Sequence, residues 1–254
     1  MTCPRVLIVA GSDSGGGAGI QADIKTVTML GGHAMTAITA LTAQNTLGVQ
    51  GVLPVSADFV VQQMRSCLDD IGVDAVKIGM IGSADVANAV ADVLDGVDTP
   101  VVFDPVMIAT SGAVLADAGT IAAFARLMRL ATVVTPNLPE LAALGGEAAV
   151  LAHGPAVLIK GGHADGDDVV DRLTLAAGEA ARWSNPRIHT PHTHGTGCTL
   201  ASAIAAGLGA GMALADATGR AIGFVRASLA AAPGLGGGHG PMGQQAATGF
   251  SCQA

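Results

Sequence analysis

The sequence predicts an α/β fold built on a mostly parallel sheet. Three short, continuous apolar runs are typical of strands buried on both faces: RVLIVA at 5–10, VVFD at 101–104 and AVLIK at 156–160. Segments with helical periodicity lie between such runs, and this alternation predicts βαβ units with right-handed crossovers. Half of the 254 residues are hydrophobic and no linker-like tract interrupts them, so we expect one domain over residues 1–254.

In the first half of the chain, each expected strand leads into a helix. A glycine-rich loop at 11–19 follows the first strand, and Ser56 stands where it could cap a later helix. We expect strands at 5–10, 33–44, 73–79 and 101–104, and helices at 20–30, 56–70 and 83–94.

The second half repeats the alternation and then changes character. We expect helices at 118–130, 199–208 and 214–232, strands at 132–135 and 156–160, and a short helix capped by Asn137. Weaker alternation at 169–175 and 180–184 predicts antiparallel edge strands. The Gly-rich stretch from about 235 to 254 has no periodicity, so we expect a loosely ordered tail.

Composition excludes several functional classes. A net charge of -8 and an aromatic content of 2% argue against a nucleic-acid partner, which needs clustered cations and stacking side chains. No leader pattern and no uninterrupted apolar run long enough to span a bilayer is present, so we expect a cytoplasmic protein without a membrane partner. The four cysteines form no paired motif, which indicates reduced thiols.

The loop at 11–19 lies at the sheet edge where α/β proteins bind ligands. Its glycines do not have the spacing of a dinucleotide fingerprint, and no Gly-Lys-Ser/Thr closes it as in a Walker A loop. The loop instead brings Asp13, Gln21 and Asp23 near the end of the first strand. Asp23 and Gln44 could read a heterocycle with donor and acceptor edges, or each could simply cap a loop.

A second glycine-rich turn, HGTGCT at 194–199, feeds a helical segment. Gly195, Thr196, Gly197 and Cys198 would place unpaired backbone N–H groups at a helix start, which favours an anion such as phosphate. The same position favours the thiolate form of Cys198. Alternatively, the glycines form only a tight turn and Cys198 is a small buried hydrophobe.

Charged residues follow three other expected strands. Asp104 and Glu140 could hold waters of a Mg²⁺ ion, although Asn137 and Glu140 can equally be capping residues. Lys160, followed by Gly161 and Gly162, is a candidate for neutralising phosphate. The histidines at 189, 192 and 194 lack a fourth ligand at zinc spacing, so a zinc site is disfavoured.

Seven motifs in order across nearly the whole chain carry a family resemblance. They are AGSDSGGGAGIQAD at 10–23, ALTAQNTLGVQ at 40–50, KIGM at 77–80, DPVM at 104–107, TPNLPE at 135–140, KGGH at 160–163 and HGTGCT at 194–199. Together they resemble the hydroxymethylpyrimidine/phosphomethylpyrimidine kinases of thiamine biosynthesis, members of the ribokinase-like superfamily. The resemblance implies a three-layer ribokinase-like fold. It also implies that ATP phosphorylates 4-amino-5-hydroxymethyl-2-methylpyrimidine and then its monophosphate.

The resemblance also implies roles for individual residues. The acceptor-binding residues would be Asp23, Gln44, Gly11, Met80, Val106 and Met107. The nucleotide-binding residues would be Asn137, Lys160, Gly162 and Thr199, with Asp104 and Glu140 serving Mg²⁺. The catalytic residues would be Lys160 and the anion hole of Gly195, Thr196, Gly197 and Cys198, with Cys198 where sugar-kinase relatives carry a catalytic aspartate. ATP, Mg²⁺ and a possible monovalent cation are the implied cofactors, and a homodimer is the implied assembly.

Two departures from the family pattern bear on activity. The segment between Glu140 and Lys160 is short, and Thr110 and Ala113 stand where relatives often carry Lys and Asp. Two alternatives therefore accompany the kinase interpretation. One is a pyridoxal or pyridoxine kinase, whose substrate also carries a hydroxymethyl group on an aromatic heterocycle. The other is a non-catalytic pyrimidine-binding protein of the same fold.

Overall fold

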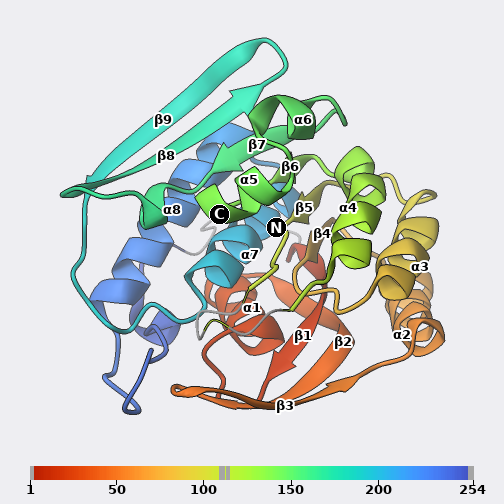
Figure 1. Cartoon of the computed structure of the whole chain (residues 1–254), viewed down its shortest axis with the longest axis horizontal. Helices are drawn as coiled ribbons and strands as arrows, with labels where there is room; N and C mark the ends of the chain where they lie inside the picture. Colours follow the sequence, from red (N-terminus) through yellow and green to blue (C-terminus); the bar gives the residue numbers. More distant parts are fainter. Residues whose placement is uncertain (1–2, 109–111, 113–114, 251–254) are drawn as a thin grey trace.

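The computed structural model describes residues 3–108, 112 and 115–250. Within these residues, nine strands form one sheet in the order β3-β2-β1-β4-β5-β6-β7-β8-β9 (Figure 1). The strands are β1 (Arg5–Asp13), β2 (His33–Asn45), β3 (Gly48–Pro54), β4 (Ala75–Ile78), β5 (Val101–Phe103), β6 (Val133–Val134), β7 (Ala156–Ile159), β8 (Asp168–Leu175) and β9 (Gly178–Pro186). The six strands from β2 to β7 in this order pair in parallel, whereas β3, β8 and β9 are antiparallel. The predicted fold class, including its antiparallel edge strands, is confirmed.

Eight α-helices and two short 3-10 turns complete the described part of the chain. The helices are α1 (Gly19–Met29), α2 (Ala57–Asp70), α3 (Ala84–Leu94), α4 (Ala118–Leu130), α5 (Leu138–Ala143), α6 (Glu147–Leu151), α7 (Thr196–Gly209) and α8 (Leu214–Ala230). The turns are η1 (Gly161–His163) and η2 (Gln244–Ala246). No helix in this part of the chain combines the length and apolar character needed to cross a bilayer.

Strand β1 shows why the sheet carries helices on both faces. Successive side chains of a strand point to opposite faces. Accordingly, Leu7 and Val9 enter one buried cluster, whereas Val6 and Ile8 enter another. Helices α2, α3 and α4 cover the first face and α1, α7 and α8 cover the second, which gives three layers (Figure 1).

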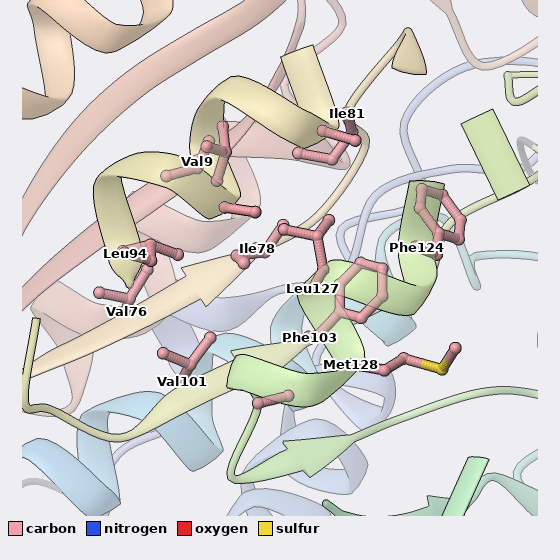
Figure 2. Close-up of a cluster of buried hydrophobic side chains, with 14 of the residues drawn as sticks. Val9, Val76, Ile78, Ile81, Leu94, Val101, Phe103, Phe124, Leu127 and Met128 are labelled. Carbon is pink, nitrogen blue, oxygen red and sulfur yellow. The ribbon is translucent and has the colours of Figure 1, made fainter. Parts of the chain in front are cut away.

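The first cluster is aliphatic, with one aromatic pair at its centre. Figure 2 shows Phe103 of β5 and Phe124 of α4 among the surrounding Val, Ile, Leu and Met side chains. Their ring centroids lie 5.1 Å apart with the planes at 84°, the edge-to-face arrangement that aromatic quadrupoles favour. This contact fixes α4 over β5, the strand that directly precedes Asp104.

Several predicted boundaries were wrong in informative ways. Strand β1 continues through the predicted loop as far as Asp13, with a bulge between Ala10 and Ser12. Strand β3 was not predicted, because most of its side chains are exposed and carry no alternating apolar pattern. Helix α7 begins at Thr196, three residues before the predicted start, so the whole glycine turn belongs to the helix start.

The short segment between Glu140 and Lys160 still covers the sheet. Helix α6 occupies it and buries Val150 completely. Before it, Asn137 and Glu140 form the predicted cap of α5: the side chain of each accepts the backbone N–H of the other at 2.8 Å. Thr110 and Ala113 lie outside the described residues.

The Gly-rich segment after α8 packs against the body of the protein, in contrast to the loosely ordered tail that its composition predicted. Within the described residues, the N–H of His239 donates to the carbonyl of Thr46 at 2.9 Å, and Gly243 N–H donates to Ser228 at 2.9 Å. Met242 is 1% exposed. Backbone contacts that require bare glycines therefore hold this segment, and such contacts leave no hydrophobic pattern in the sequence.

Candidate active site

One cavity of about 780 Å³ lies at the carboxyl ends of the parallel strands and the start of α7. Fourteen of the sixteen residues expected in the site line it: Gly11, Gln44, Met80, Asp104, Val106, Met107, Asn137, Glu140, Lys160, Gly162, Gly195, Thr196, Gly197 and Cys198. Asp23 and Thr199 do not. The position at the carboxyl edge is the one at which open α/β sheets bind ligands.

The first turn of α7 has the geometry of an anion hole. Gly195 adopts a left-handed conformation with φ of 85°, and a Cβ there would lie 2.0 Å from the carbonyl oxygen of Gly17. Only glycine fits this turn. In the described part of the chain, no protein acceptor meets the N–H groups of Gly197 and Cys198, as is typical of a first helical turn. These groups can therefore donate to an anion in the cavity.

Lys160 faces this anion hole from the end of β7. Its ammonium nitrogen lies 2.7 Å from Asp104 Oδ1 and 3.7 Å from Glu140 Oε2. Burial lowers the pKa of Lys160, but the attraction of the two carboxylates outweighs burial and raises the pKa overall. A Cβ on Gly197 would lie 3.3 Å from Lys160 Nζ. The lysine is therefore a fixed cation beside the free N–H groups.

Asp104 and Glu140 fit a magnesium ion only in part. Their carboxylates are hard oxygen donors of the kind that Mg²⁺ prefers. However, the Lys160 ammonium group contacts both carboxylates, and the backbone N–H of Asn137 already donates to Glu140 Oε2. Burial raises the pKa of Glu140, and Asp104 adds to this effect against the attraction of Lys160. Among the described residues, no group of three or more His, Cys, Asp or Glu side chains could hold a metal. A Mg²⁺ ion here would therefore rely on waters and nucleotide phosphates for most of its ligands.

Cys198 is a neutral thiol at physiological pH, contrary to the thiolate expected at a helix start. Burial raises its pKa to about 11, and the carboxylates of Asp23 and Asp104 act in the same direction. The positive charge of Lys77 and the N–H of Gly19 oppose the shift without cancelling it. Desolvation thus outweighs the helix dipole at this cysteine.

Asp23 does not contact the cavity, which corrects its predicted place in the acceptor pocket. Its side chain is fully buried, 2.8 Å from Lys77 Nζ and 2.7 Å from the Ser202 hydroxyl that donates to it. Burial raises the pKa of the Asp23 carboxyl, whereas attraction to Asp23 outweighs burial for Lys77 and raises the pKa of that ammonium group. Because of the short contact and the hydroxyl donor, we treat the two as an ion pair. Asp23 neutralises a buried lysine whose charge acts on Cys198.

Thr199 also lies away from the cavity, which corrects its expected contact with nucleotide. The residue is fully buried, and its hydroxyl accepts a hydrogen bond from Gln244 Nε2 at 3.1 Å. It joins α7 to the turn η2.

The glycine loop after β1 is closed by its own carboxylate. The N–H groups of Gly15, Gly17 and Ala18 donate to Asp13 at 2.8, 3.0 and 2.9 Å. Burial alone would raise the pKa of Asp13, but hydrogen bonds from His194 and these N–H groups lower it overall. The Asp13 carboxylate thus occupies the N–H groups of this loop, which leaves the first turn of α7 as the candidate site for a phosphate.

The opposite end of the cavity contains residues that the sequence did not reveal. Apolar side chains from β8, from α8 and from the segment after β9 line a part of the cavity that we call the apolar slot: Val169, Ile188, Ile222, Val225 and Leu229. Arg187 holds the neighbouring loop by donating to the carbonyls of Gly162, Ala164 and Gly166 at 2.9, 2.6 and 2.8 Å. Asp171 accepts the N–H of Gly161 at 2.9 Å. These contacts join residues 10 to 25 positions apart, so no local motif signals them.

Solved structures of related proteins are kinases. An ADP complex of Bacillus subtilis pyridoxal kinase is similar with a TM-score of 0.88 and 32% identity, over 96% of this chain and 98% of that one. A phosphomethylpyrimidine kinase from Clostridium difficile is similar with a TM-score of 0.75 and 34% identity, over 89% and 98%. With its ribokinase-like fold and anion hole, the chain is a small-molecule kinase, a phosphotransferase.

Sequence comparison narrows this class. A family model described as phosphomethylpyrimidine kinase matches residues 13–243. The hydroxymethylpyrimidine/phosphomethylpyrimidine kinase of Streptomyces coelicolor is 49% identical over 95% of this chain and 94% of its own length. The protein of the same name from Rhizobium meliloti is 45% identical over 93% and 95%. The chain belongs to the phosphomethylpyrimidine kinase family.

Proposed function

We propose that the protein transfers the γ-phosphoryl group of ATP first to 4-amino-5-hydroxymethyl-2-methylpyrimidine and then to the resulting monophosphate, in thiamine biosynthesis. One observation carries the proposal: Gln44, with donor and acceptor groups for a heterocycle, lines the same cavity as Lys160 and the free N–H groups of α7. Relatives that bear this activity in their names cover nearly the whole chain.

Charge stabilisation and positioning supply most of the catalysis in this mechanism. Phosphoryl transfer passes through a loose transition state in which negative charge spreads over the equatorial oxygens. Donors at Gly197 and Cys198 and the ammonium of Lys160 face the place where that charge develops. Mg²⁺ held by the nucleotide phosphates, with Asp104 and Glu140 binding its waters, would neutralise further charge.

The two phosphorylations make different demands on Cys198. In the first, a hydroxyl must lose its proton late in the reaction, and a neutral thiol can orient that hydroxyl without taking the proton early. In the second, the acceptor is already a phosphate and needs no base. Cys198 therefore serves the first step more than the second.

The apolar slot lined by Val169, Ile188 and Val225 is the proposed place of the adenine base, with Asn137 and Gly162 toward the phosphates. We further propose a cytoplasmic homodimer. The support for a dimer is exposed apolar area on and beside the edge strand β3, where Val52 is 51% and Leu53 63% exposed. Sedimentation at several protein concentrations tests the assembly.

Pyridoxal phosphorylation is the second candidate, and the TM-score of 0.88 with a pyridoxal kinase favours it. Incubating the purified protein with ATP, Mg²⁺ and either the pyrimidine alcohol, its monophosphate or pyridoxal, followed by phosphorus NMR, decides between them. We expect turnover of both pyrimidines. Phosphorylation of pyridoxal alone would replace the proposal with the second candidate, and turnover of none would leave a non-catalytic pyrimidine-binding protein.

A further inference from the structure

His194 links two side chains at the acceptor end of the cavity. Its Nε2 lies 2.9 Å from Asp13 Oδ2 and 3.1 Å from Gln44 Nε2. The ring is held from two other sides: the backbone N–H of His194 donates to the Gly240 carbonyl at 3.2 Å, and a Cβ on Gly17 would come within 2.5 Å of the ring. The imidazole therefore has a fixed place between the carboxylate and the carboxamide.

Asp13 decides which atom of the imidazole carries a proton. Three backbone N–H groups already donate to its carboxylate, which favours the ionised form. An ionised carboxylate can only accept hydrogen bonds, so His194 Nε2 must bear a hydrogen. Any atom of Gln44 that meets Nε2 must consequently be an acceptor, and an amide nitrogen cannot be one.

The hydrogen bonds of Thr42, at the other end of the Gln44 carboxamide, favour the same orientation of the amide. Its single hydroxyl hydrogen lies within reach of two oxygens, the Ser12 carbonyl at 2.9 Å and Gln44 Oε1 at 3.1 Å. Only one of them can receive it. If the amide is turned by half a rotation, its NH₂ group donates to the Thr42 hydroxyl, and its oxygen faces the Nε2–H of His194, whose single hydrogen it shares with Asp13 Oδ2. The turned amide therefore removes the contact between two donors at His194 and the competition for the Thr42 hydrogen. The two amide ends are alike in shape, so the hydrogen-bond network determines their assignment.

We propose that Asp13, His194 and Thr42 act as positioning residues that hold the Gln44 carboxamide with its oxygen toward the imidazole, and that this fixed amide sets the acceptor specificity. The inference rests on the proposed function and deepens it. The amide oxygen keeps a second lone pair and the nitrogen a second hydrogen. An acceptor and a donor thus remain side by side for a heterocycle with an amino group next to a ring nitrogen.

A free carboxamide would rotate to suit other edges, whereas a fixed one cannot. A pyrimidine lacking the amino group leaves a desolvated amide oxygen without a partner, so it should bind about tenfold more weakly or worse. The test compares 4-amino-5-hydroxymethyl-2-methylpyrimidine with its analogue lacking the 4-amino group, by titration calorimetry. The wild-type protein should prefer the amino compound by at least about tenfold.

Two substitutions release the amide from opposite ends. His194→Leu and Thr42→Val should each reduce the preference for the amino compound to within about threefold, by allowing the amide to turn. Gly17→Ala, which displaces the imidazole, should act in the same direction. Gly96→Ala is the matched control, because a Cβ there meets nothing within 4 Å. In addition, nitrogen-15 NMR of the wild-type protein should show His194 with hydrogen on Nε2.

Equal binding of the two compounds by the wild-type protein would overturn the inference. An unchanged preference for the amino compound in folded Thr42→Val and Gly17→Ala variants would also overturn the inference. If the wild-type protein still phosphorylates the pyrimidine alcohol in that case, the proposed function stands without the inference. Binding of neither compound would overturn the proposed function together with the inference.

Discussion

Gly197 approaches Lys160 so closely that a Cβ on the glycine would lie 3.3 Å from the ammonium nitrogen. Asp104 fixes that nitrogen from the other side at 2.7 Å. A phosphoryl group bound by the N–H groups of α7 would therefore meet a cation whose position is set before the substrate arrives. Such preorganised charge is usually the largest contribution to catalysis of this kind.

Lys160→Met should lower kcat by about 100-fold or more, because it removes the cation beside the anion hole. The KM for the pyrimidine should change much less, since Lys160 lies away from Gln44. Lys25→Met provides the control: that lysine is exposed, and among the described residues it donates only to the Gly16 carbonyl, at 2.8 Å. Steady-state kinetics with matched circular dichroism spectra checks both. Equal loss in the two variants would contradict a specific role for Lys160.

Gly197→Ala should lower kcat/KM by about tenfold while the protein remains folded, because the added methyl group displaces Lys160 or blocks the bound phosphate. Gly195→Ala should be worse: its φ of 85° and the 2.0 Å approach of the Gly17 carbonyl make any side chain destabilising. Thermal melting and kinetics together separate the two effects. A Gly195→Ala variant with the wild-type melting temperature would show that the turn is not constrained as described.

Cys198 should alkylate slowly at neutral pH, because the thiolate is the nucleophile and burial disfavours it. In a variant with Cys3, Cys67 and Cys252 replaced by serine, the rate of reaction with iodoacetamide should rise through an apparent pKa of about 11. Folding raises this pKa above its value of 9.0, so the associated stability is complete below pH 9.0 and is lost as pH rises through about 11. Cys198→Ala should remove that alkaline loss. An apparent pKa below 8 would contradict this prediction and support the thiolate form that the position at a helix start predicts.

The same Cys198→Ala variant separates the two phosphorylations. Loss of the first step with the second largely retained would support a role of the thiol in orienting the hydroxyl. Equal loss of both steps would indicate that the substitution disturbs the anion hole itself. Phosphorus NMR with the alcohol and the monophosphate as separate substrates measures the two rates.

The sequence predicted the sheet, and it selected fourteen residues that line one cavity, because both follow from local patterns. Continuous apolar runs such as 156–160 predict buried parallel strands. The glycines of the HGTGCT motif predict the tight turn that leaves backbone N–H groups free at the start of α7. Asp23 was misplaced for a physical reason: its partner Lys77 lies 54 positions away, and a polar residue in a helix does not reveal whether it faces a cavity or a buried charge. The pKa of Cys198 likewise depends on burial that only the packed structure defines.

The pair of Asp23 and Lys77 should contribute to stability and not to acceptor binding. Asp23→Ala leaves a fully buried ammonium group without its partner, which should cost about 3–5 kcal/mol in the free energy of unfolding. The double variant Asp23→Leu/Lys77→Met should recover most of that loss, because neither charge is then buried. Urea denaturation measures both. A stable Asp23→Ala protein with a raised KM for the pyrimidine would return Asp23 to the acceptor pocket.

Arg187 should affect nucleotide binding through the loop that it holds. Its guanidinium donates to three carbonyls between Gly162 and Gly166, and Gly162 lines the cavity beside Lys160. Arg187→Met should therefore raise the KM for ATP by roughly fivefold to tenfold with kcat nearly unchanged. The reason is that the loop contributes equally to binding ATP in the ground state and in the transition state, so its loss weakens binding without slowing the chemical step. Arg187→Lys should restore little, since one ammonium group cannot reach three carbonyls in the geometry of a guanidinium.

Arg182→Met is the matched control for this experiment. Arg182 is an exposed arginine on strand β9, and within the described part of the chain its guanidinium pairs only with Glu179, at 2.8 Å. Its loss should leave both kinetic constants unchanged, since isolated surface pairs contribute little. If Arg187→Met raises the KM for the pyrimidine and leaves the KM for ATP unchanged, the nucleotide binds at the other end of the cavity. The proposed orientation of the two substrates would then be reversed.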